Sequence, residues 1–349
     1  MKTITINGKK MGSGHSTYVI AEISANHNHD IQEAVDLINI AKDCGADAVK
    51  IQTYTPDTMT IDCDNEYFQI GKGTIWEGKN LYQLYGEAFM PWNWTTRLIA
   101  EAKKIGITLF SSPFDSTSVD FLEGLGMPAY KIASFELVDH PLIARVAKTG
   151  KPVIMSTGMG TLREISEAVE VLKSNGCSEY ALLKCTSSYP APANEANLAR
   201  IKHMAEVFDV PVGLSDHTMG SIVPAVAVGL GACIIEKHFT KSRDVEGPDS
   251  AFSMEPHEFK EMVASVRVAE QAAGEVTYEL TEKESDSRVF RKSIFIVKDM
   301  KAGELLTEEN TRVIRPGYGL HPKHLKELIG KKVRTQLPKG TPVSWDIIE

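Results

Sequence analysis

The chain lacks the features that would mark it as a membrane or exported protein. No hydrophobic run approaches the roughly 20 residues that cross a bilayer. The N-terminus, from Met1 to Lys10, alternates like a short strand and lacks the long apolar segment of a signal peptide. The five cysteines are scattered and show no paired spacing of the kind found in zinc sites. We therefore expect a cytoplasmic protein with no membrane partner.

The chain also has no excess of positive charge. Its 38 lysines and arginines are outnumbered by 46 acidic residues, which gives a formal net charge of −8. This balance disfavours a general nucleic-acid surface, although it leaves room for a local cationic pocket that binds a small anion. We expect no nucleic-acid partner.

What the chain does have is a regular alternation of short apolar runs and amphipathic stretches. Apolar runs that do not alternate with polar residues are typical of parallel strands buried on both faces. There are eight such runs, and a barrel of eight strand-helix repeats takes about 250 residues. The sequence therefore predicts an α/β fold, a (β/α)8 TIM barrel. The expected strands are Tyr18–Ile23, Ala48–Gln52, Thr108–Ser111, Ala129–Ile132, Pro152–Met155, Tyr180–Lys184, Val210–Leu214 and Ala232–Glu236.

Amphipathic stretches between these runs predict the helices. They are Ile31–Cys44, Trp94–Ile105, Thr117–Leu125, Pro141–Lys148, Leu162–Asn175, Glu195–Val207 and Ile222–Leu230, and Glu258–Ala273 follows the last strand. A glycine before several strands, as at Gly106 and Gly150, is typical of a helix that ends there. The long aromatic-rich segment 54–91 interrupts the pattern, and we expect it to shape the substrate pocket.

The pattern changes after Ala273. A polar stretch is followed by short strands and turns that run to the C-terminus. We expect a barrel domain at 1–275, a linker at 276–289 and a small, mostly β domain at 290–349. Such a small domain has only a modest core of its own, so we expect it to pack against another surface.

Two histidines each follow an expected strand, His217 in PVGLSDH and His238 in ACIIEKH. If both strands are parallel neighbours, the two imidazoles meet at one rim of the barrel, where active sites of this fold lie. A divalent metal could bind there, with Glu22 and Asp249 as oxygen ligands or water-holders. The alternative, that each is an ordinary core or loop histidine, remains open on the spacing alone.

Lys50 and Lys131 also lie at expected strand ends, with no acidic neighbour close in sequence. Buried lysines need a counter-charge, which an anionic substrate could supply. Hydroxyl and backbone donors around Ser134, Ser156 and Ser215 suit a phosphate or carboxylate. The Ser156–Gly158 segment could equally be a tight turn only.

Three further features have competing interpretations. The aromatic segment 76–94 could be a surface lid or a platform for a sugar. Cys185 fits a buried small hydrophobe better than a nucleophile. Lys237 fits a paired or snorkelling lysine better than a functional one.

Several motifs, in this order, resemble those of the sialic acid synthase family across nearly the whole chain. They are Ile20–Ile23 (IAEI), Asn26–His27, Gly45–Gln52 (GADAVKIQ), Ser156–Met159 (STGM), Cys185–Pro190 (CTSSYP), Gly213–His217 (GLSDH), Glu236–Phe239 (EKHF) and Gly247–Asp249 (GPD). The tail, with Lys292–Ile294, Gly303–Glu304, Arg315–Gly317 and Gly340–Pro342, looks like the SAF (antifreeze-like) domain of that family.

The resemblance implies a transferase that condenses phosphoenolpyruvate with a 2-acetamido aldose to a nine-carbon 2-keto acid. By similarity, His217 and His238 hold a divalent metal, usually Mn²⁺ with Mg²⁺ or Co²⁺ as alternatives, which polarises the sugar aldehyde. Matching positions for phosphoenolpyruvate are Lys50, Ser112, Lys131, Ser134, Ser156, Ser187 and Ser215. Gln52, Tyr189 and Asp249 match positions near the sugar or metal.

Two carboxylates and an arginine complete the implied site. Glu22 is expected to handle a water or proton on the metal side, and Glu136 to contact the sugar or stabilise a cationic intermediate. Arg315 matches an arginine that reaches from the small domain of one subunit into the barrel of the other. The resemblance therefore implies a domain-swapped homodimer.

Within the family, three segments resemble the pseudaminic acid synthases: 54–60, 81–94 and 249–256. Ser187, where neuraminate synthases commonly carry Asn, points the same way. The implied sugar is 2,4-diacetamido-2,4,6-trideoxy-altrose, whose C6 methyl would favour an apolar or aromatic wall. The alternatives are an N-acetylneuraminate or legionaminate synthase, or a non-catalytic sugar-binding protein on the same scaffold.

Overall fold

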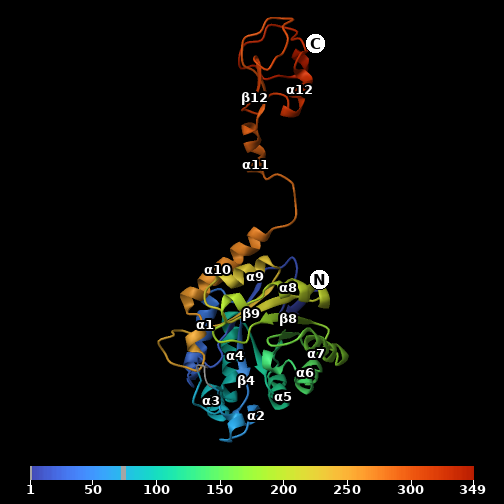
Figure 1. Ribbon diagram of the computed structural model, residues 1–349. Coiled ribbons are helices and arrows are strands. Elements are labelled where there is room, and N and C mark those ends of the chain that lie inside the picture. Colours follow the sequence, from blue (N-terminus) through green and yellow to red (C-terminus); the bar gives the residue numbers. More distant parts are fainter. Residues whose placement is uncertain (1, 72–75) are drawn as a thin grey trace. The chain divides into compact units, whose positions relative to one another are not determined.

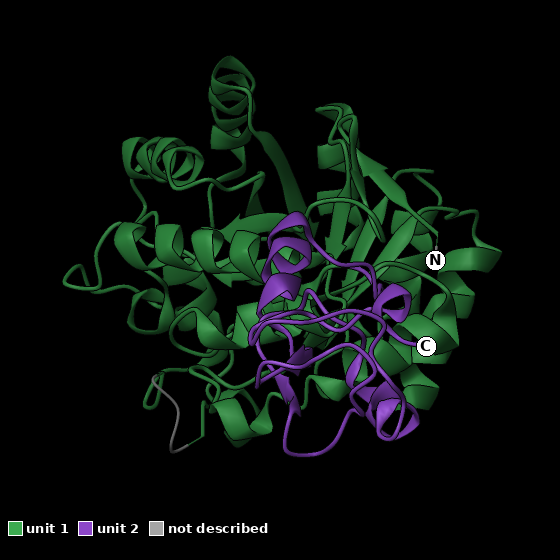
Figure 2. Ribbon diagram, turned by 90° about the horizontal axis from the view of Figure 1, so that it is seen from above, with its two compact units in different colours: residues 1–274 green, residues 275–349 purple. Residues whose placement is uncertain are grey.

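The computed structural model describes residues 2–71 and 76–349 and divides the chain into two compact units, 1–274 and 275–349. Figure 2 shows them in green and purple. The expected long segment 54–91 includes residues 72–75, which lie outside the described part. Within the described residues, no helix combines the length and apolar character needed to cross a membrane.

Eight parallel strands form a closed barrel in the first unit, which confirms the predicted fold. Each predicted strand lies within two residues of the observed one at both ends. The strands are β3 (Tyr18–Glu22), β4 (Ala48–Thr53), β5 (Thr108–Pro113), β6 (Tyr130–Ile132), β7 (Val153–Ser156), β8 (Tyr180–Cys185), β9 (Val212–Asp216) and β10 (Ile234–His238). The last strand, β10, pairs with both β9 and β3 and so closes the barrel. A short hairpin of β1 (Ile4–Ile6) and β2 (Lys9–Met11) precedes them.

The helices that follow the strands surround the barrel (Figure 1). They are α1 (Ile31–Asp43), α4 (Thr95–Ile105), α5 (Ser116–Gly124), α6 (His140–Ala147), α7 (Leu162–Ser174), α8 (Ala199–Phe208), α9 (Ile222–Gly229) and α10 (Pro256–Ala273). Local signals set their ends: Thr161 forms a capping box with Glu164 at the start of α7, and Gly106 ends α4 with φ 68°. Helix α8 begins four residues later than predicted, after Asn197, whose φ of 41° is not helical.

One apolar core lies in the barrel and beneath its helices. It is built from strand residues such as Ile20, Val49 and Leu182, which are fully buried. Burying each such side chain contributes about 1.5–3 kcal/mol. This packing fixes the positions at which the strands end, and therefore the positions of the polar side chains that follow them.

In its described residues, the segment between β4 and α4 contains two helices. They are α2 (Pro56–Met59) and α3 (Leu81–Ala88), with short 3-10 turns at Glu66–Phe68 and Trp92–Trp94. Asn80 caps α3 by accepting a hydrogen bond from the Gln83 backbone N–H, and the Gln83 side chain returns the contact.

The second unit has its own small core and a two-stranded antiparallel sheet of β11 (Ser293–Ile296) and β12 (Thr311–Ile314). Two short helices, α11 (Glu282–Ser287) and α12 (Leu325–Leu328), belong to it. Helix α11 lies within the stretch that the sequence suggested as a linker. Fully buried residues such as Ile294 and Val343 hold this unit together.

Candidate active site

Two buried lysines share one carboxylate at the centre of the barrel mouth. Lys50 projects from β4 and Lys131 from β6, and their Nζ atoms lie 3.4 and 3.3 Å from Oε1 of Glu236 on β10. Glu236 was not among the residues expected in the site, although strand alternation places its side chain on the same face as that of His238. The positive charge of the lysines lowers the pKa of Glu236, although burial alone would raise it.

A second carboxylate, Glu22 on β3, forms an ion pair with Lys50. Burial raises the pKa of Glu22, and the nearby Glu236 charge adds to that effect. The lysines therefore have acidic partners in the folded protein. The sequence showed none because these partners come from strands distant in the chain.

Hydroxyl groups surround this charged cluster. Ser156 Oγ accepts a 2.8 Å hydrogen bond from Lys131, and Ser112 Oγ accepts a longer one of 3.4 Å from Lys50. Ser215 Oγ donates to Glu236 across 3.3 Å. Three of the predicted phosphoenolpyruvate positions are therefore attached directly to the charged cluster.

The other two serines lie around Gly158, just after β7. The Gly158 N–H donates to Ser134 Oγ at 3.1 Å. A Cβ atom added at Gly158 would lie 2.3 Å from Ser187 Oγ and 2.7 Å from Ser134 Oγ. The Ser156–Gly158 segment is thus more than a turn: it is a point of close approach between the loops after β6, β7 and β8, where any larger residue must displace the Ser134 and Ser187 side chains.

The two histidines lie together, as their placement at the ends of β9 and β10 predicts, with ring centroids 5.3 Å apart. His217 Nδ1 lies 2.8 Å from the Thr186 carbonyl, so it carries the hydrogen and leaves Nε2 with a free lone pair. His238 Nδ1 is buried without a hydrogen-bond partner. Burial holds the pKa of His238 well below its usual value, so this imidazole is neutral.

This pair fits a divalent metal. Neutral imidazoles are good ligands, and an unpartnered buried nitrogen is the kind of atom that a metal satisfies. Within residues 2–71 and 76–349, no three His, Cys, Asp or Glu side chains are grouped closely enough to form a metal site. The protein would therefore hold the metal through His217 and His238, with further ligands from water or substrate.

Asp249 and Gln52 lie close to this pair. Asp249 accepts a hydrogen bond from Ser24, and Gln52 Nε2 donates to the same serine oxygen at 3.2 Å. Burial raises the pKa of Asp249. Both side chains line the same cavity as His238, which agrees with positions near a sugar or a metal-bound water.

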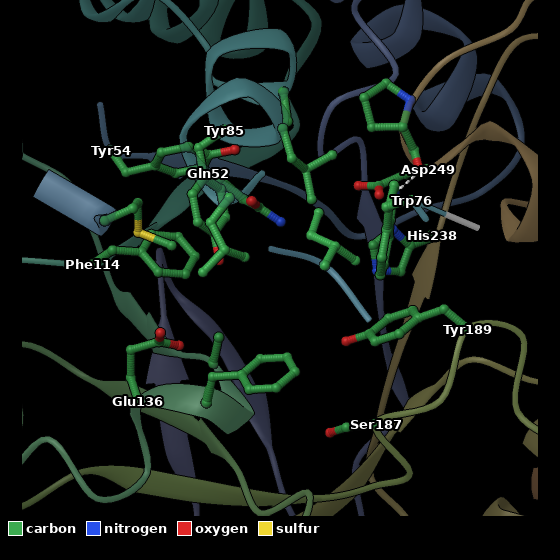
Figure 3. A pocket seen from close by; sticks show the side chains of 18 of the residues that line it. Gln52, Tyr54, Trp76, Tyr85, Phe114, Glu136, Ser187, Tyr189, His238 and Asp249 are labelled. Carbon is green, nitrogen blue, oxygen red and sulfur yellow. Dashed lines mark hydrogen bonds between the residues drawn. The ribbon is translucent and has the colours of Figure 1, made fainter. Parts of the chain in front are cut away.

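A cavity of about 590 Å³ is lined on one side by His238 and Tyr189. Figure 3 shows Asp249, Trp76, His238 and Tyr189 on one side of it, and Tyr54 and Phe114 on the other. The Tyr189 ring lies 4.3 Å from the His217 ring and 6.2 Å from the His238 ring, between centroids. Tyr189 belongs to the loop after β8, and this loop brings its side chain into the cavity wall beside both histidines.

Part of the aromatic segment lines the cavity and part does not. Trp76 and Tyr85 are among the lining residues, and the Trp76 indole N–H donates to the Pro248 carbonyl at 2.8 Å. Trp92 instead stacks on Phe121, and Trp94 packs against His27. Trp76 and Tyr85 therefore belong to the cavity wall, whereas Trp92 and Trp94 pack against other side chains.

Glu136, in the 3-10 turn after β6, also lines the cavity. Its Oε2 atom is buried without a hydrogen-bond partner. Burial raises the pKa of this carboxyl to about 7. Glu136 can therefore exchange a proton near neutral pH, as a general acid or base must.

The remaining residues behave as follows. Arg315 directly follows β12 and belongs to the second unit, whereas all the other predicted site residues belong to the first. Lys237 is fully buried and pairs with Asp216 at 2.6 Å, so it is paired rather than snorkelling. Cys185 is buried, with its Sγ atom 3.8 Å from His217 Nδ1.

Comparison with known proteins gives a consistent picture. A pseudaminic acid synthase from Helicobacter pylori is 44% identical over 95% of this chain and 97% of that protein. One from Campylobacter jejuni is 45% identical over 93% of this chain and 94% of that protein. A crystal structure of N-acetylneuraminic acid synthetase from Leptospira borgpetersenii superposes with a TM-score of 0.73 at 30% identity, covering 82% of this chain and 95% of that one.

Family profiles divide the chain in the same place as its two units. The NeuB family matches residues 37–278, and the SAF domain matches residues 291–349. The chain is therefore a member of the NeuB family, an enzyme of the transferase class that carries a C-terminal SAF domain.

Proposed function

We propose that the chain is a pseudaminic acid synthase, which condenses phosphoenolpyruvate with 2,4-diacetamido-2,4,6-trideoxy-altrose and releases phosphate. The observation that carries this proposal is the placement of two histidines and two lysines at one barrel mouth, where His238 also lines a cavity of about 590 Å³. Identity of 44–45% to pseudaminic acid synthases over more than nine-tenths of the chain supports the choice of sugar.

In this proposal the lysines bind phosphoenolpyruvate. Lys50 and Lys131 attract its anionic groups, and the hydroxyls of Ser112, Ser134, Ser156, Ser187 and Ser215 orient it by hydrogen bonds. Glu22 and Glu236 hold the two ammonium groups in place until the substrate arrives. The cluster is thus preorganised for an anion.

His217 and His238 would hold a divalent metal, for which we propose Mn²⁺. When bound, the metal supplies Lewis-acid polarisation of the sugar aldehyde. Gln52, Tyr189 and Asp249 then orient the sugar so that its C1 lies beside the histidines and faces C3 of phosphoenolpyruvate.

The bond changes balance as follows. The C3 carbon of phosphoenolpyruvate attacks the aldehyde carbon, which leaves positive charge at C2. Glu136, as a carboxylate, stabilises that charge, and Glu22 accepts one proton of the water that adds to C2 and passes it to the former aldehyde oxygen, which becomes a hydroxyl. The C2–O bond to phosphate then breaks, the C2 hydroxyl gives its proton to the leaving phosphate, and the products are the 2-keto acid and inorganic phosphate.

We also propose a cytoplasmic homodimer in which Arg315 of one subunit acts in the barrel of the other. The five cysteines support a reducing compartment, since each is a free thiol. Arg315 supports the exchange through its resemblance to the family position, and it lies in the SAF unit rather than the barrel unit.

The test is an assay of purified enzyme with phosphoenolpyruvate, Mn²⁺ and each candidate sugar, with released phosphate as the readout. We expect the altrose derivative to have the highest kcat/KM. Preference for N-acetylmannosamine or the legionaminate precursor would replace the proposed sugar. No metal-dependent phosphate release with any sugar would favour a binding protein.

A further inference from the structure

One side of the cavity carries a group of carbon-rich side chains, beside the polar Gln52 and Glu136 (Figure 3). This apolar wall consists of Tyr54 at the end of β4, Met59 of α2, Leu81, Leu84 and Tyr85 of α3, and Phe114 after β5. Met59 and Phe114 contain no hydrogen-bonding oxygen or nitrogen in their side chains. In Figure 3, Tyr54, Tyr85 and Phe114 face His238 and Tyr189 across the cavity.

The apolar wall is held in place by contacts between its own rings and by hydrogen bonds outside the cavity. The Tyr54 ring makes edge contacts with Phe114 and Tyr85, at centroid distances of 5.2 and 5.8 Å. The Trp92 indole N–H donates to the Tyr54 carbonyl at 3.0 Å. His29 contacts the Glu87 carbonyl near the end of α3 at 2.9 Å. A wall fixed in this way cannot rotate a polar group into the cavity at low cost.

The opposite side of the cavity has the hydrogen-bonding groups of Ser187, Tyr189, His238 and Asp249, together with the rings of Trp76 and Phe252. This inference rests on the proposed function, in which C1 of an open-chain sugar lies at the histidines. In that pose the far end of the six-carbon chain, C6, is placed at the other side of the cavity, against the apolar wall.

We propose that the apolar wall, through Met59 and Phe114, selects a sugar with a methyl group at C6 and disfavours one with a hydroxyl there. A hydroxyl placed against these side chains loses its hydrogen bonds to water and gains none. A methyl group has no such penalty and buries its own apolar surface. The apolar wall therefore discriminates between sugars by the presence or absence of one oxygen atom at C6, far from the reacting carbon.

The test compares two sugars that differ only in that atom, 2,4-diacetamido-2,4,6-trideoxy-altrose and its 6-hydroxy analogue. We expect wild type to favour the deoxy sugar in kcat/KM by tenfold or more, the range typical of a hydrophobic pocket. Met59→Gln and Phe114→Tyr each add a hydrogen-bonding group to the wall. Each should lower that ratio by about tenfold and leave the KM for phosphoenolpyruvate unchanged.

Ile61→Gln is the matched control, because Ile61 is two residues from Met59, is 60% exposed and does not line the cavity. Its ratio should equal that of wild type. Equal kcat/KM for the two sugars in wild type would overturn the proposal without any variant, as would an unchanged ratio in both wall variants. If wild type turns over neither sugar, the proposed function fails instead.

Discussion

Glu236 Oε1 lies 3.3 Å from Lys131 Nζ inside the barrel mouth, and Lys50 shares the same oxygen. In the free enzyme the Glu236 carboxylate is therefore the counter-ion of both ammonium groups. A phosphate group that binds to the lysines must compete with the Glu236 carboxylate, because that carboxylate is already paired with both ammonium groups. This arrangement ties the stability of the free barrel to its affinity for phosphoenolpyruvate.

Glu236→Gln keeps the shape of the side chain and removes its charge. We expect the free enzyme to lose stability, because two buried ammonium groups then share only Glu22. The stabilising shift in Tm caused by phosphoenolpyruvate should be larger than in wild type, since the substrate replaces the missing charge. Thermal melts with and without phosphoenolpyruvate measure both effects. Glu258→Gln, which removes an acidic partner of Arg243 elsewhere, should leave the shift unchanged, and an equal shift in Glu236→Gln would contradict the prediction.

His217→Ala and His238→Ala should each remove metal-dependent activity. Loss of Lewis-acid stabilisation worth several kcal/mol corresponds to a fall in kcat/KM of about 10³-fold or more. Metal content after dialysis checks the cause, and we expect bound Mn²⁺ to be lost from both variants with the circular dichroism spectrum retained. His203→Ala, on the outer helix α8, is the control. Stoichiometric Mn²⁺ in either site variant would argue against this pair as the metal ligands.

Glu136 links function to pH. Its pKa of about 7 in the folded enzyme lies above the value of about 4.5 for an ordinary glutamate, so the folded state binds the proton more tightly than the unfolded state. Stability contributed by this group is therefore present below pH 4.5 and lost as the pH rises through 7. Glu136→Gln should be more stable than wild type at pH 8, by about 3 kcal/mol at most, and nearly equal to it at pH 4.5.

Activity should follow the opposite trend, because the carboxylate form is the one that stabilises positive charge. We expect kcat/KM of wild type to rise with pH through about 7. A rise with the same midpoint in Glu136→Gln would assign the titration to another group.

Gly158→Ala tests the close approach of the two serines. A Cβ at this position would push on Ser134 and Ser187, both of which are side-chain oxygens that can move. We expect a folded enzyme whose KM for phosphoenolpyruvate is about tenfold higher, which is the loss of roughly one hydrogen bond. The KM for the sugar should change little. Gly160→Ala provides a contrast, because its Cβ would instead meet the Leu137 side chain at 2.4 Å and should act on stability.

Arg315 tests the proposed exchange between subunits. Arg315→Ala and His238→Ala should each be inactive alone. If Arg315 acts in the partner barrel, a mixed dimer of the two contains one intact site, and co-refolded mixtures should regain up to about a quarter of wild-type activity by random pairing. Phosphate release and light scattering measure the activity and the dimer. A mixture as inactive as its components would place Arg315 in its own barrel or outside the reaction.

Much of the fold could be predicted because buried parallel strands and helix-ending glycines leave strong local signals. Each of the eight strands was found within two residues, and Gly106 and Gly150 have the positive φ expected at such ends. The start of α8 was misplaced because a single residue, Asn197, adopts φ 41° in a stretch whose pattern is otherwise helical.

The site could be predicted only in part. Strand ends place His217 and His238 together, because the rule that parallel neighbours share a rim needs no coordinates. The partners of Lys50 were missed: Glu22 lies opposite Lys50 on the neighbouring strand β3, and Glu236 lies on β10, which pairs with β3 only because the barrel closes. Met59 and Phe114 could not be placed in one wall from the sequence either. Met59 belongs to the long segment 54–91 and Phe114 follows β5, and only the folded chain brings both to the same cavity.

Closure of the barrel by β10 has a consequence for synthesis of the enzyme. His238 lies opposite Glu22 in the pairing of the last strand with the first, so the active site has its two halves at the two ends of the barrel sequence. A nascent chain that has not yet released residue 238 from the ribosome has the lysines and most of the serines but no second histidine. The histidine pair that we propose as the metal ligands is therefore complete only after nearly all of the barrel has been synthesised.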